Sequence, residues 1–350
     1  MKFGFQLPTG MEGLIVPPDF IPPGDFISMA VTGEKLGYDS LWGNDHYAVQ
    51  DYVRARFDTP PRFYDVLTVL AAVVAVTKHV ELGTSILVLP MRDLVSVARQ
   101  VSTLDQLSGG RLLLGVGIGA YKEEYAAVRP DLVGENRGTI LEEALSLLNL
   151  LLSEGSVTFQ GKYYHVESLE LFPKPFRKPF PILIGGHQKL GIERAVKFGE
   201  GWIPGWRPFD ELKEWIQLLY VKATEAGRDP RSLIIAPQFS CLVAHTMEEA
   251  VKQYENSGMV QHRKSLAYTG RDPGLAMENN LIGTPEVLLK KIEQLDSFGV
   301  NHLSALTFCV NSRSEFEEQI HYFAEEVMHP YRKKHTTNQP SCSPRIIPPG

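Results

Sequence analysis

Residues 104–125 read LDQLSGGRLLLGVGIGAYKEEY, a stretch that is unusually rich in glycine. Glycine recurs there at every second position, as Gly115, Gly117 and Gly119. A period of two is typical of a β-strand and places the three glycines on one face. Glycine is unfavourable inside a strand unless another group approaches the backbone closely. The pattern therefore predicts a strand with a bare face, which leaves room either for a ligand or for the side chains of neighbouring strands.

A dinucleotide-binding turn is a poor match to the same residues. That turn needs G-x-G-x-x-G at the start of a helix, with an acidic residue about 20 positions later. The spacing in this chain is that of a strand interior, so a nucleotide fold is not indicated.

The rest of the chain alternates between strand-like and helix-like segments. Short β-branched or aromatic runs occur at 2–7, 39–43, 80–87, 111–117, 181–184, 202–204, 233–243 and 301–307. Amphipathic segments of helical length occur at 25–36, 64–78, 94–107, 137–153, 188–199, 209–226, 285–298 and 314–328. Eight strands that alternate with helices predict an α/β fold, a (β/α)8 TIM barrel. The alternative is an open doubly wound sheet, which the missing phosphate-binding motif after the first strand disfavours.

Three segments interrupt the alternation. Residues 9–24 form a loop rich in proline and glycine, residues 156–166 are predicted to form a small hairpin, and residues 246–283 contain helical pieces and a polar stretch. In a barrel the first and last of these lie at the C-terminal face, where barrel enzymes have their active sites. We expect 246–283 to act as a lid, since its residues 261–274 carry three basic side chains, Arg263, Lys264 and Arg271.

Composition places the chain among ordinary globular proteins. It has 350 residues, of which 43% are hydrophobic, and a formal net charge of −6. The acidic balance argues against a nucleic acid or acidic lipid partner, and no apolar stretch reaches the roughly 20 residues that cross a bilayer. We expect a cytoplasmic protein with one domain over 1–335 and a disordered, proline- and serine-rich tail over 336–350.

Two short motifs carry candidate chemistry. The second strand leads into Asp45 and His46, and a histidine beside a carboxylate at the mouth of a barrel is suited to proton transfer. Gly185 and Gly186 stand between a strand and a helix, where exposed amides suit a phosphate, although an ordinary turn has the same pattern. No histidine or cysteine spacing indicates a metal site, and a G-x-S-x-G nucleophile motif is absent.

Taken together, the chain resembles the luciferase-like monooxygenase superfamily, which includes bacterial luciferase-like enzymes and F420-dependent oxidoreductases. The matching segments cover most of residues 1–328 in family order. They are GYDSLWGNDHY (37–47), ELGTSILVLP (81–90), the stretch from 98 to 125, NRGTILEEAL (136–145), FPKPFRKPFPILIGG (172–186), AVKFGEGWIPG (195–205) and IGTPEVLLKKI (282–292).

The resemblance implies a barrel whose C-terminal mouth holds reduced coenzyme F420 or FMN. The cofactor-binding positions that it implies are Ser85, Ile86, Gly117, Gly119, Gly185 and Gly186. Within this set, the Ser85–Ile86 peptide would be cis and support the ring, Gly117 and Gly119 would line the ring's edge, and the glycine pair would give amides to the phosphate.

The implied activity is that of an oxidoreductase acting on a small organic molecule. With F420 a hydride passes to or from the substrate, and with FMN the substrate is oxygenated; in both cases His46, with Asp45, would handle a proton. The Asp45-His46 pair favours F420 slightly, because FMN luciferases tend to have Glu-His-His there. Ala120 stands where sugar-phosphate dehydrogenases of the family have an acid, so that substrate class is doubtful.

Two other hypotheses about the function are compatible with the sequence. One is a non-catalytic flavin-binding paralogue, and the other is a barrel hydrolase, which the missing nucleophile disfavours. The family also implies a homodimer.

Overall fold

A computed structural model describes residues 1–267 and 272–336 of the chain. Arg271 and nearly all of the predicted tail, 337–350, lie outside the described residues. Within the described part, no helix is long and apolar enough to cross a membrane.

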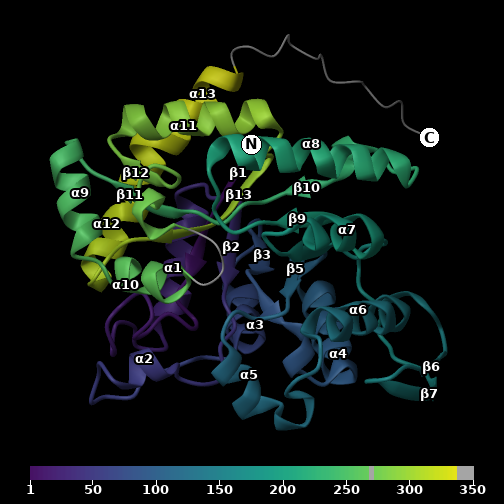
Figure 1. The fold of residues 1–350 in the computed structure, drawn as a ribbon. Helices are drawn as coiled ribbons and strands as arrows, with labels where there is room; N and C mark the ends of the chain where they lie inside the picture. Colours follow the sequence, from purple (N-terminus) through teal and green to yellow (C-terminus); the bar gives the residue numbers. More distant parts are fainter. Residues whose placement is uncertain (268–271, 337–350) are drawn as a thin grey trace.

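A curled parallel sheet forms the centre of the molecule, and helices cover its outer side (Figure 1). The strands follow one another across the sheet in the order β10-β9-β8-β5-β3-β2-β1-β13-β11-β12. Most of the main strands match the predicted ranges to within one residue: β1 (Lys2–Leu7), β2 (Ser40–Gly43), β5 (Leu112–Gly117), β8 (Ile182–Gly185), β9 (Gly201–Ile203) and β13 (His302–Phe308). The exception is β3 (Glu81–Thr84), which ends three residues before its predicted end.

Two of the predicted strands are each divided in the structure. The strand expected over 80–87 is β3 followed by β4 (Leu87–Val88), and the strand expected over 233–243 is β10 (Ile234–Ile235) followed by β11 (Ser240–Val243). Proline at 237 has no amide hydrogen for a sheet hydrogen bond, which accounts for the second interruption.

The interrupted segment brings the two sides of the sheet together. β10 pairs with β9, β11 pairs with β13 and with β12 (Leu281–Gly283), and the Asn301 amide donates to the Ile235 carbonyl at 3.3 Å. The predicted parallel α/β fold is therefore confirmed, whereas the exact count of eight β/α units stays a prediction.

The helices begin and end close to the predicted positions. Those that cover the sheet are α1 (Asp25–Lys35), α3 (Val66–Val76), α4 (Leu94–Ser108), α6 (Arg137–Ser153), α7 (Lys189–Phe198), α8 (Phe209–Glu225), α11 (Pro285–Phe298) and α12 (Arg313–Phe323). The last continues through a π-helical turn, 324–328, into α13 (His329–Thr336). Side-chain caps explain the sharp starts of α4 and α6, where Asp93 accepts from the Ser96 amide and Asn136 accepts from the Gly138 amide.

The interruptions also take the expected form. The predicted hairpin is present as β6 (Val157–Gln160) and β7 (His165–Leu169), at the edge of the molecule (Figure 1). Residues 246–283 contain α9 (Met247–Glu255) and α10 (Gly258–Ser265) before β12.

Glycines of the sheet make room for large side chains of adjacent strands. A β-carbon on Gly83 would overlap with the indole of Trp42, and one on Gly115 would overlap with the Thr84 carbonyl oxygen. The neighbouring strand β3 thus fills the space beside Gly115 on the bare face of β5. Of the two alternatives, packing of neighbouring strands applies here, and ligand binding does not.

Gly115 therefore provides a direct test of this packing. We predict that Gly115→Ala lowers the free energy of unfolding by about 2 to 3 kcal/mol, because a backbone carbonyl cannot move aside as a flexible side chain can. Gly155→Ala is the control, since a β-carbon there has no neighbour within 4 Å. Urea unfolding of both variants measures the difference, and equal stabilities would contradict the packing account.

Candidate functional site

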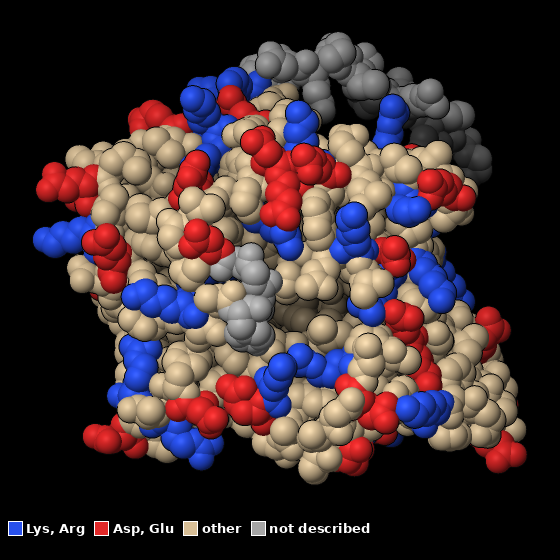
Figure 2. Space-filling view, in the orientation of Figure 1, with Lys and Arg blue, Asp and Glu red and all other residues tan. Residues whose placement is uncertain are grey.

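A cavity of about 440 Å³ opens at the carboxyl ends of the parallel strands. Figure 2 shows a hollow near the middle of this face, with lysine and arginine side chains along its border. The cavity brings together seven of the eight site residues predicted from the sequence, namely Asp45, His46, Ser85, Ile86, Gly119, Gly185 and Gly186.

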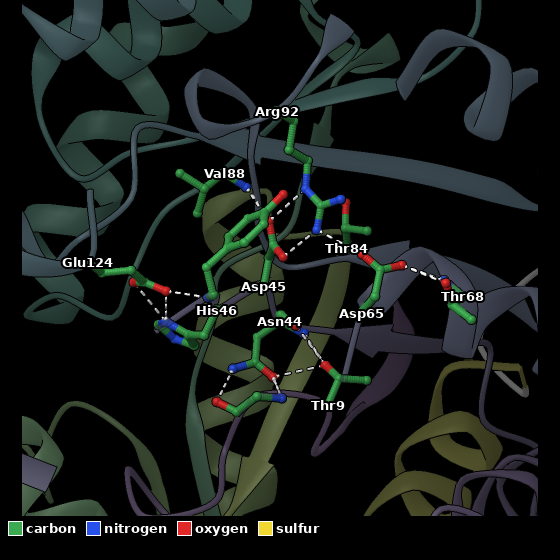
Figure 3. Close-up of polar contacts among 12 residues, drawn as sticks. Thr9, Asn44, Asp45, His46, Asp65, Thr68, Thr84, Val88, Arg92 and Glu124 are labelled. Atoms are coloured by element: carbon green, nitrogen blue, oxygen red, sulfur yellow. Dashed lines mark hydrogen bonds and ion pairs between the residues drawn. The ribbon is translucent and has the colours of Figure 1, made fainter. Parts of the chain in front are cut away.

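The three residues after β2 point in three different directions (Figure 3). Asn44 bonds to the Thr9 hydroxyl and to Gly10, Asp45 turns toward Arg92, and His46 turns toward Glu124. Asp45 and His46 therefore do not form the carboxylate–histidine pair that their adjacency in the sequence indicates. Each has its own charged partner from a distant segment of the chain.

Asp45 holds a structural ion pair. Its Oδ1 accepts from Arg92 Nη2 at 2.6 Å, while Oδ2 accepts from Arg92 Nε at 3.1 Å and from the Val88 amide at 3.0 Å. Burial lowers the pKa of Arg92, but the bonds to Asp45 outweigh burial and raise that pKa. With its oxygens occupied in this way, Asp45 anchors β4 and is not placed to exchange a proton with His46.

Glu124 is the carboxylate that contacts His46. It belongs to α5 (Lys122–Val128), is 2% exposed, and lies with Oε2 3.1 Å from His46 Nδ1. Burial raises the pKa of Glu124, yet hydrogen bonds from His46 and from the Tyr47 and Ala48 amides outweigh burial and lower it. Gln50 Nε2 also lies 3.3 Å from His46 Nδ1. An ionised carboxylate at Nδ1 favours the tautomer with the proton on Nδ1, in which Nε2 is the nitrogen that can act on a ligand.

Sequence reasoning missed Glu124, although a signal was present. The chain has Ala120 where sugar-phosphate dehydrogenases of the family have an acid. An acidic residue lies four positions later instead, in the first turn of α5. A carboxylate in the first turn of the helix after β5 can reach the end of β2, which lies beyond β3 in the sheet.

The predicted cis peptide between Ser85 and Ile86 is confirmed. Gln238 Nε2 donates to the Ser85 carbonyl at 3.1 Å and also bonds to the Ser85 hydroxyl, so the turn after β3 is held across the cavity floor. Ile86 Cδ1 fills the space above Gly117, where a β-carbon would overlap with it. Gly117 consequently lies beneath Ile86 and is not among the lining residues, and its place at the ring's edge stays a prediction.

Gly119 does line the cavity, but it lies beyond the end of β5. Its φ of 76° is in the left-handed region that favours glycine, so the strand alternation stops at Gly117. The prediction that all three glycines share one strand face is therefore wrong for Gly119.

The glycine pair after β8 is partly committed to the sheet. The Gly186 amide donates to the Ile203 carbonyl at 3.2 Å, so it is not available to a phosphate as predicted. Gly186 also packs against Gly191 of α7, and the absence of two side chains lets the helix start close to the turn.

The cationic end of the cavity lies at the starts of α6 and α7. Arg137 and Arg194 line it, together with Asn136 and Gln188, which precede the two helices. Arg137 donates to the Gly119 carbonyl at 3.1 Å, and Arg194 bonds to Glu142 at 2.9 Å. Helix N-termini with arginines form an anion-binding end, and α7 has no side-chain cap on its first amides.

No cluster of histidine, cysteine or acidic side chains in the described part of the chain is arranged to hold a metal ion. Asp45 is the acidic side chain among the described lining residues, and Arg92 neutralises it. The cavity is thus a cationic site with a partly buried histidine, of the kind that binds an organic anion.

A TIM-barrel-like α/β protein with its cavity at the carboxyl ends of the strands is a class with many enzymes. The model of the luciferase-like monooxygenase family matches residues 1–302, and the chain belongs to this family. The resemblance inferred from the sequence is therefore confirmed, and the family includes F420- and FMN-dependent members.

Relatives with named activities use both cofactors. The chain is 32% identical over 182 residues to an F420-dependent glucose-6-phosphate dehydrogenase of Kineococcus radiotolerans, which spans 52% of each protein. It is 24% identical over 289 residues to an FMNH2-dependent dimethylsulfone monooxygenase of Pseudomonas putida, covering 76% of this chain and 78% of the relative.

Solved structures show the same fold. The monooxygenase RslO1 from Streptomyces bottropensis has a TM-score of 0.78 at 21% identity, covering 95% of this chain and all of that one. An F420-dependent secondary alcohol dehydrogenase in complex with an F420–acetone adduct has a TM-score of 0.75 at 23% identity, covering 94% and 98%.

The contact between Glu124 and His46 can be tested through stability and tautomer. We predict that Glu124→Gln lowers the free energy of unfolding by about 1 to 3 kcal/mol at pH 7, because charge-assisted hydrogen bonds to a buried carboxylate are lost. The lowered pKa means that this stabilisation is complete above the ordinary range of a glutamate and is lost as the pH falls through the folded-state pKa.

The difference between wild type and variant should therefore shrink in urea unfolding at pH 4. Nitrogen NMR of the His46 ring should show the proton on Nδ1 in the wild type and a mixture of tautomers in Glu124→Gln. An unchanged tautomer in the variant would contradict the assigned role of Glu124.

Proposed function

We propose that this protein is an oxidoreductase that binds reduced F420 or FMN in the cavity and acts on a small organic substrate beside His46. One observation supports the proposal most strongly: His46, which contacts the buried Glu124, lines the same cavity as Ile86, Gly119 and the cationic starts of α6 and α7. F420 is preferred slightly over FMN, on the Asp45-His46 pattern.

The residues present fit such a cofactor. The cavity of about 440 Å³ is within the usual range for a small-molecule site, and it has an apolar floor at Ile86 and a cationic end at Arg137 and Arg194. We assign the ring to the region of Ile86, Gly119 and Gly185, and the phosphate to the first turn of α7 with Arg194. Because the Gly186 amide is hydrogen-bonded to the Ile203 carbonyl, we assign the phosphate to the start of the helix and not to the glycine pair.

The chain's own groups would act through position and charge. The cofactor supplies the redox chemistry, a hydride exchange in the case of F420 or oxygen activation in the case of reduced FMN. His46 Nε2 gives a proton to, or takes one from, the oxygen of the substrate, and Glu124 stabilises the protonated imidazole. Asp45 and Arg92 keep the β2 and β4 ends in register beneath these groups.

Other parts of the proposal concern the molecule as a whole. The hydrogen bond between Asn301 and Ile235 supports closure of the sheet into a (β/α)8 barrel. We further propose that 1–335 is a single domain, that the protein works as a cytoplasmic homodimer, and that α9 and α10 cover the substrate as a lid.

The phosphate assignment predicts a difference between FMN and riboflavin, which lacks the phosphate. FMN should bind at least tenfold more tightly, and Arg194→Gln should remove most of that difference, because its guanidinium lies at the cationic end. Arg231→Gln, an exposed position in a different part of the surface, is the control. Fluorescence titrations of the three proteins with each flavin give six dissociation constants, and equal affinities of the wild type for the two flavins would overturn the assignment.

The proton-transfer role predicts a separation of binding from turnover. His46→Gln should lower turnover by a factor of about 10² to 10⁴ and leave cofactor affinity within threefold of wild type. His245→Gln serves as the control, because His245 bonds to Tyr322 away from the cavity. Single-turnover kinetics with the reduced cofactor measures the rate. A wild type that binds the cofactor but turns over no organic substrate would favour the non-catalytic paralogue.

A further inference from the structure

The end of the cavity opposite Arg137 and Arg194 has a different chemical character. Its wall is mainly apolar and contains Leu14, Ile15, Phe239, Met259 and Leu266, and the polar side chains that α10 adds to the lining, His262 and Arg263, have partners in Tyr121 and Ser240. Leu14 and Ile15 belong to the loop 9–24, and Phe239 precedes β11. Met259 lies in α10, and Leu266 directly follows α10. The two interruptions of the barrel pattern therefore build this wall together.

The two interruptions are in direct backbone contact. A β-carbon on Gly258, the first residue of α10, would overlap with the carbonyl oxygen of Ile15. The loop 9–24 is itself held to the next loop by Glu12, whose buried carboxylate accepts from the Arg62 guanidinium at 2.6 Å and from the Arg62 amide at 2.9 Å. The wall is consequently preformed and does not depend on a ligand for its shape.

Polar contacts hold α10 over the cavity from the barrel side. The Tyr121 hydroxyl lies 3.2 Å from His262 Nδ1, and Arg263 Nη2 donates to the Ser240 hydroxyl at 2.6 Å. Arg263 also stacks over the ring of Trp206, with 5.6 Å between its Cζ and the ring centroid. These bonds orient the helix so that Met259 is 1% exposed and contributes to the wall.

The polar side chains at the floor are paired with one another. Thr307 donates to Gln6 at 3.1 Å, Gln238 bonds to Ser85, and Asn44 is occupied by Thr9 and Gly10. A ligand with several hydroxyl groups would find these floor groups already satisfied. Trp206 Nε1, which lines the cavity without a hydrogen-bond partner among the described residues, could donate to one ligand oxygen, while the other hydroxyls would be buried without partners. Burial of an unpaired polar group is unfavourable, so such ligands are selected against.

We propose that this apolar wall is the substrate subsite, and that the substrate is a compact apolar molecule with a single carbonyl or alcohol oxygen. The oxygen would lie toward His46, and the hydrocarbon part would contact Leu14, Ile15, Met259 and Leu266. This inference rests on the proposed function, because the cofactor is assigned to the cationic end.

A matched pair of ketones tests the subsite. Cyclohexanone and tetrahydropyran-4-one have the same shape and the same carbonyl group, but the second has an ether oxygen in place of the opposite methylene. We expect cyclohexanone to bind the protein loaded with oxidised cofactor at least tenfold more tightly, because the ether oxygen would face the apolar wall without a donor. Isothermal titration measures both dissociation constants.

Met259→Gln places a polar group of similar size in the wall. It should weaken cyclohexanone binding at least fivefold and leave the cofactor dissociation constant within twofold of wild type. Met247→Gln in α9 is the control, since Met247 is 43% exposed and lies outside the cavity lining. Leu14→Asn, in the other interruption, should reproduce the effect of Met259→Gln if the latter unfolds.

The outcomes separate this inference from the proposed function. Equal affinity for the two ketones, no binding of either ketone, or wild-type cyclohexanone affinity in both wall variants would each overturn the apolar subsite. Failure of the cofactor titration would overturn the proposed function instead. The ketone titration of the cofactor-free protein would then still report whether the wall prefers the hydrocarbon ring.

Discussion

The close approach of β2, β3 and β5 at their glycines is the constraint on which the site depends. Gly83 admits the Trp42 indole, Gly115 admits the Thr84 carbonyl, and Gly117 admits the end of Ile86. These three contacts set where β3 ends and how Ile86 sits above β5. Since Ile86 forms the floor of the cavity, the packing inside the sheet determines the shape of the site above it.

Two buried carboxylates then divide the work at the mouth of the sheet. Both carboxylate oxygens of Asp45 accept hydrogen bonds, from Arg92 and from the Val88 amide, and the latter bond connects the end of β2 to β4. Glu124 instead faces His46 and gives that ring a fixed orientation. The chain has a net charge of −6, yet its cavity is lined by Arg137, Arg194 and Arg263 with one neutralised acid. The charge of the site is therefore opposite to that of the molecule, as an anionic cofactor requires.

The sequence predicted the fold well because periodicity reports on local burial. Strand β1 and helix α6 were located to the residue, since alternation and an Asn136 cap are local signals. The division of 233–243 was not predicted. Pro237 interrupts the sheet only where a neighbouring strand would otherwise accept a hydrogen bond from an amide at that position. The prediction of the cis peptide at Ser85–Ile86 came from family resemblance alone and is confirmed.

The site was predicted less completely, since its contacts join segments far apart in the chain. His46 and Glu124 are separated by 78 residues, whereas Asp45 is adjacent in sequence and points elsewhere. The place of Gly117 at the ring's edge came from the family resemblance, because glycine spacing alone cannot tell a ligand from a neighbouring isoleucine. The apolar wall of Leu14 and Met259 likewise had no signal, because it forms only when two insertions meet.

The central claim is that the cavity binds a reduced flavin or deazaflavin next to His46. The most direct measurement is an anaerobic titration of protein with labelled histidine rings, using reduced F420, reduced FMN and NADPH in turn, followed by NMR. One equivalent of F420 or FMN is expected to saturate the protein and to shift the His46 ring resonances. Binding of NADPH alone, or cofactor binding that leaves the His46 resonances unchanged, would contradict this claim.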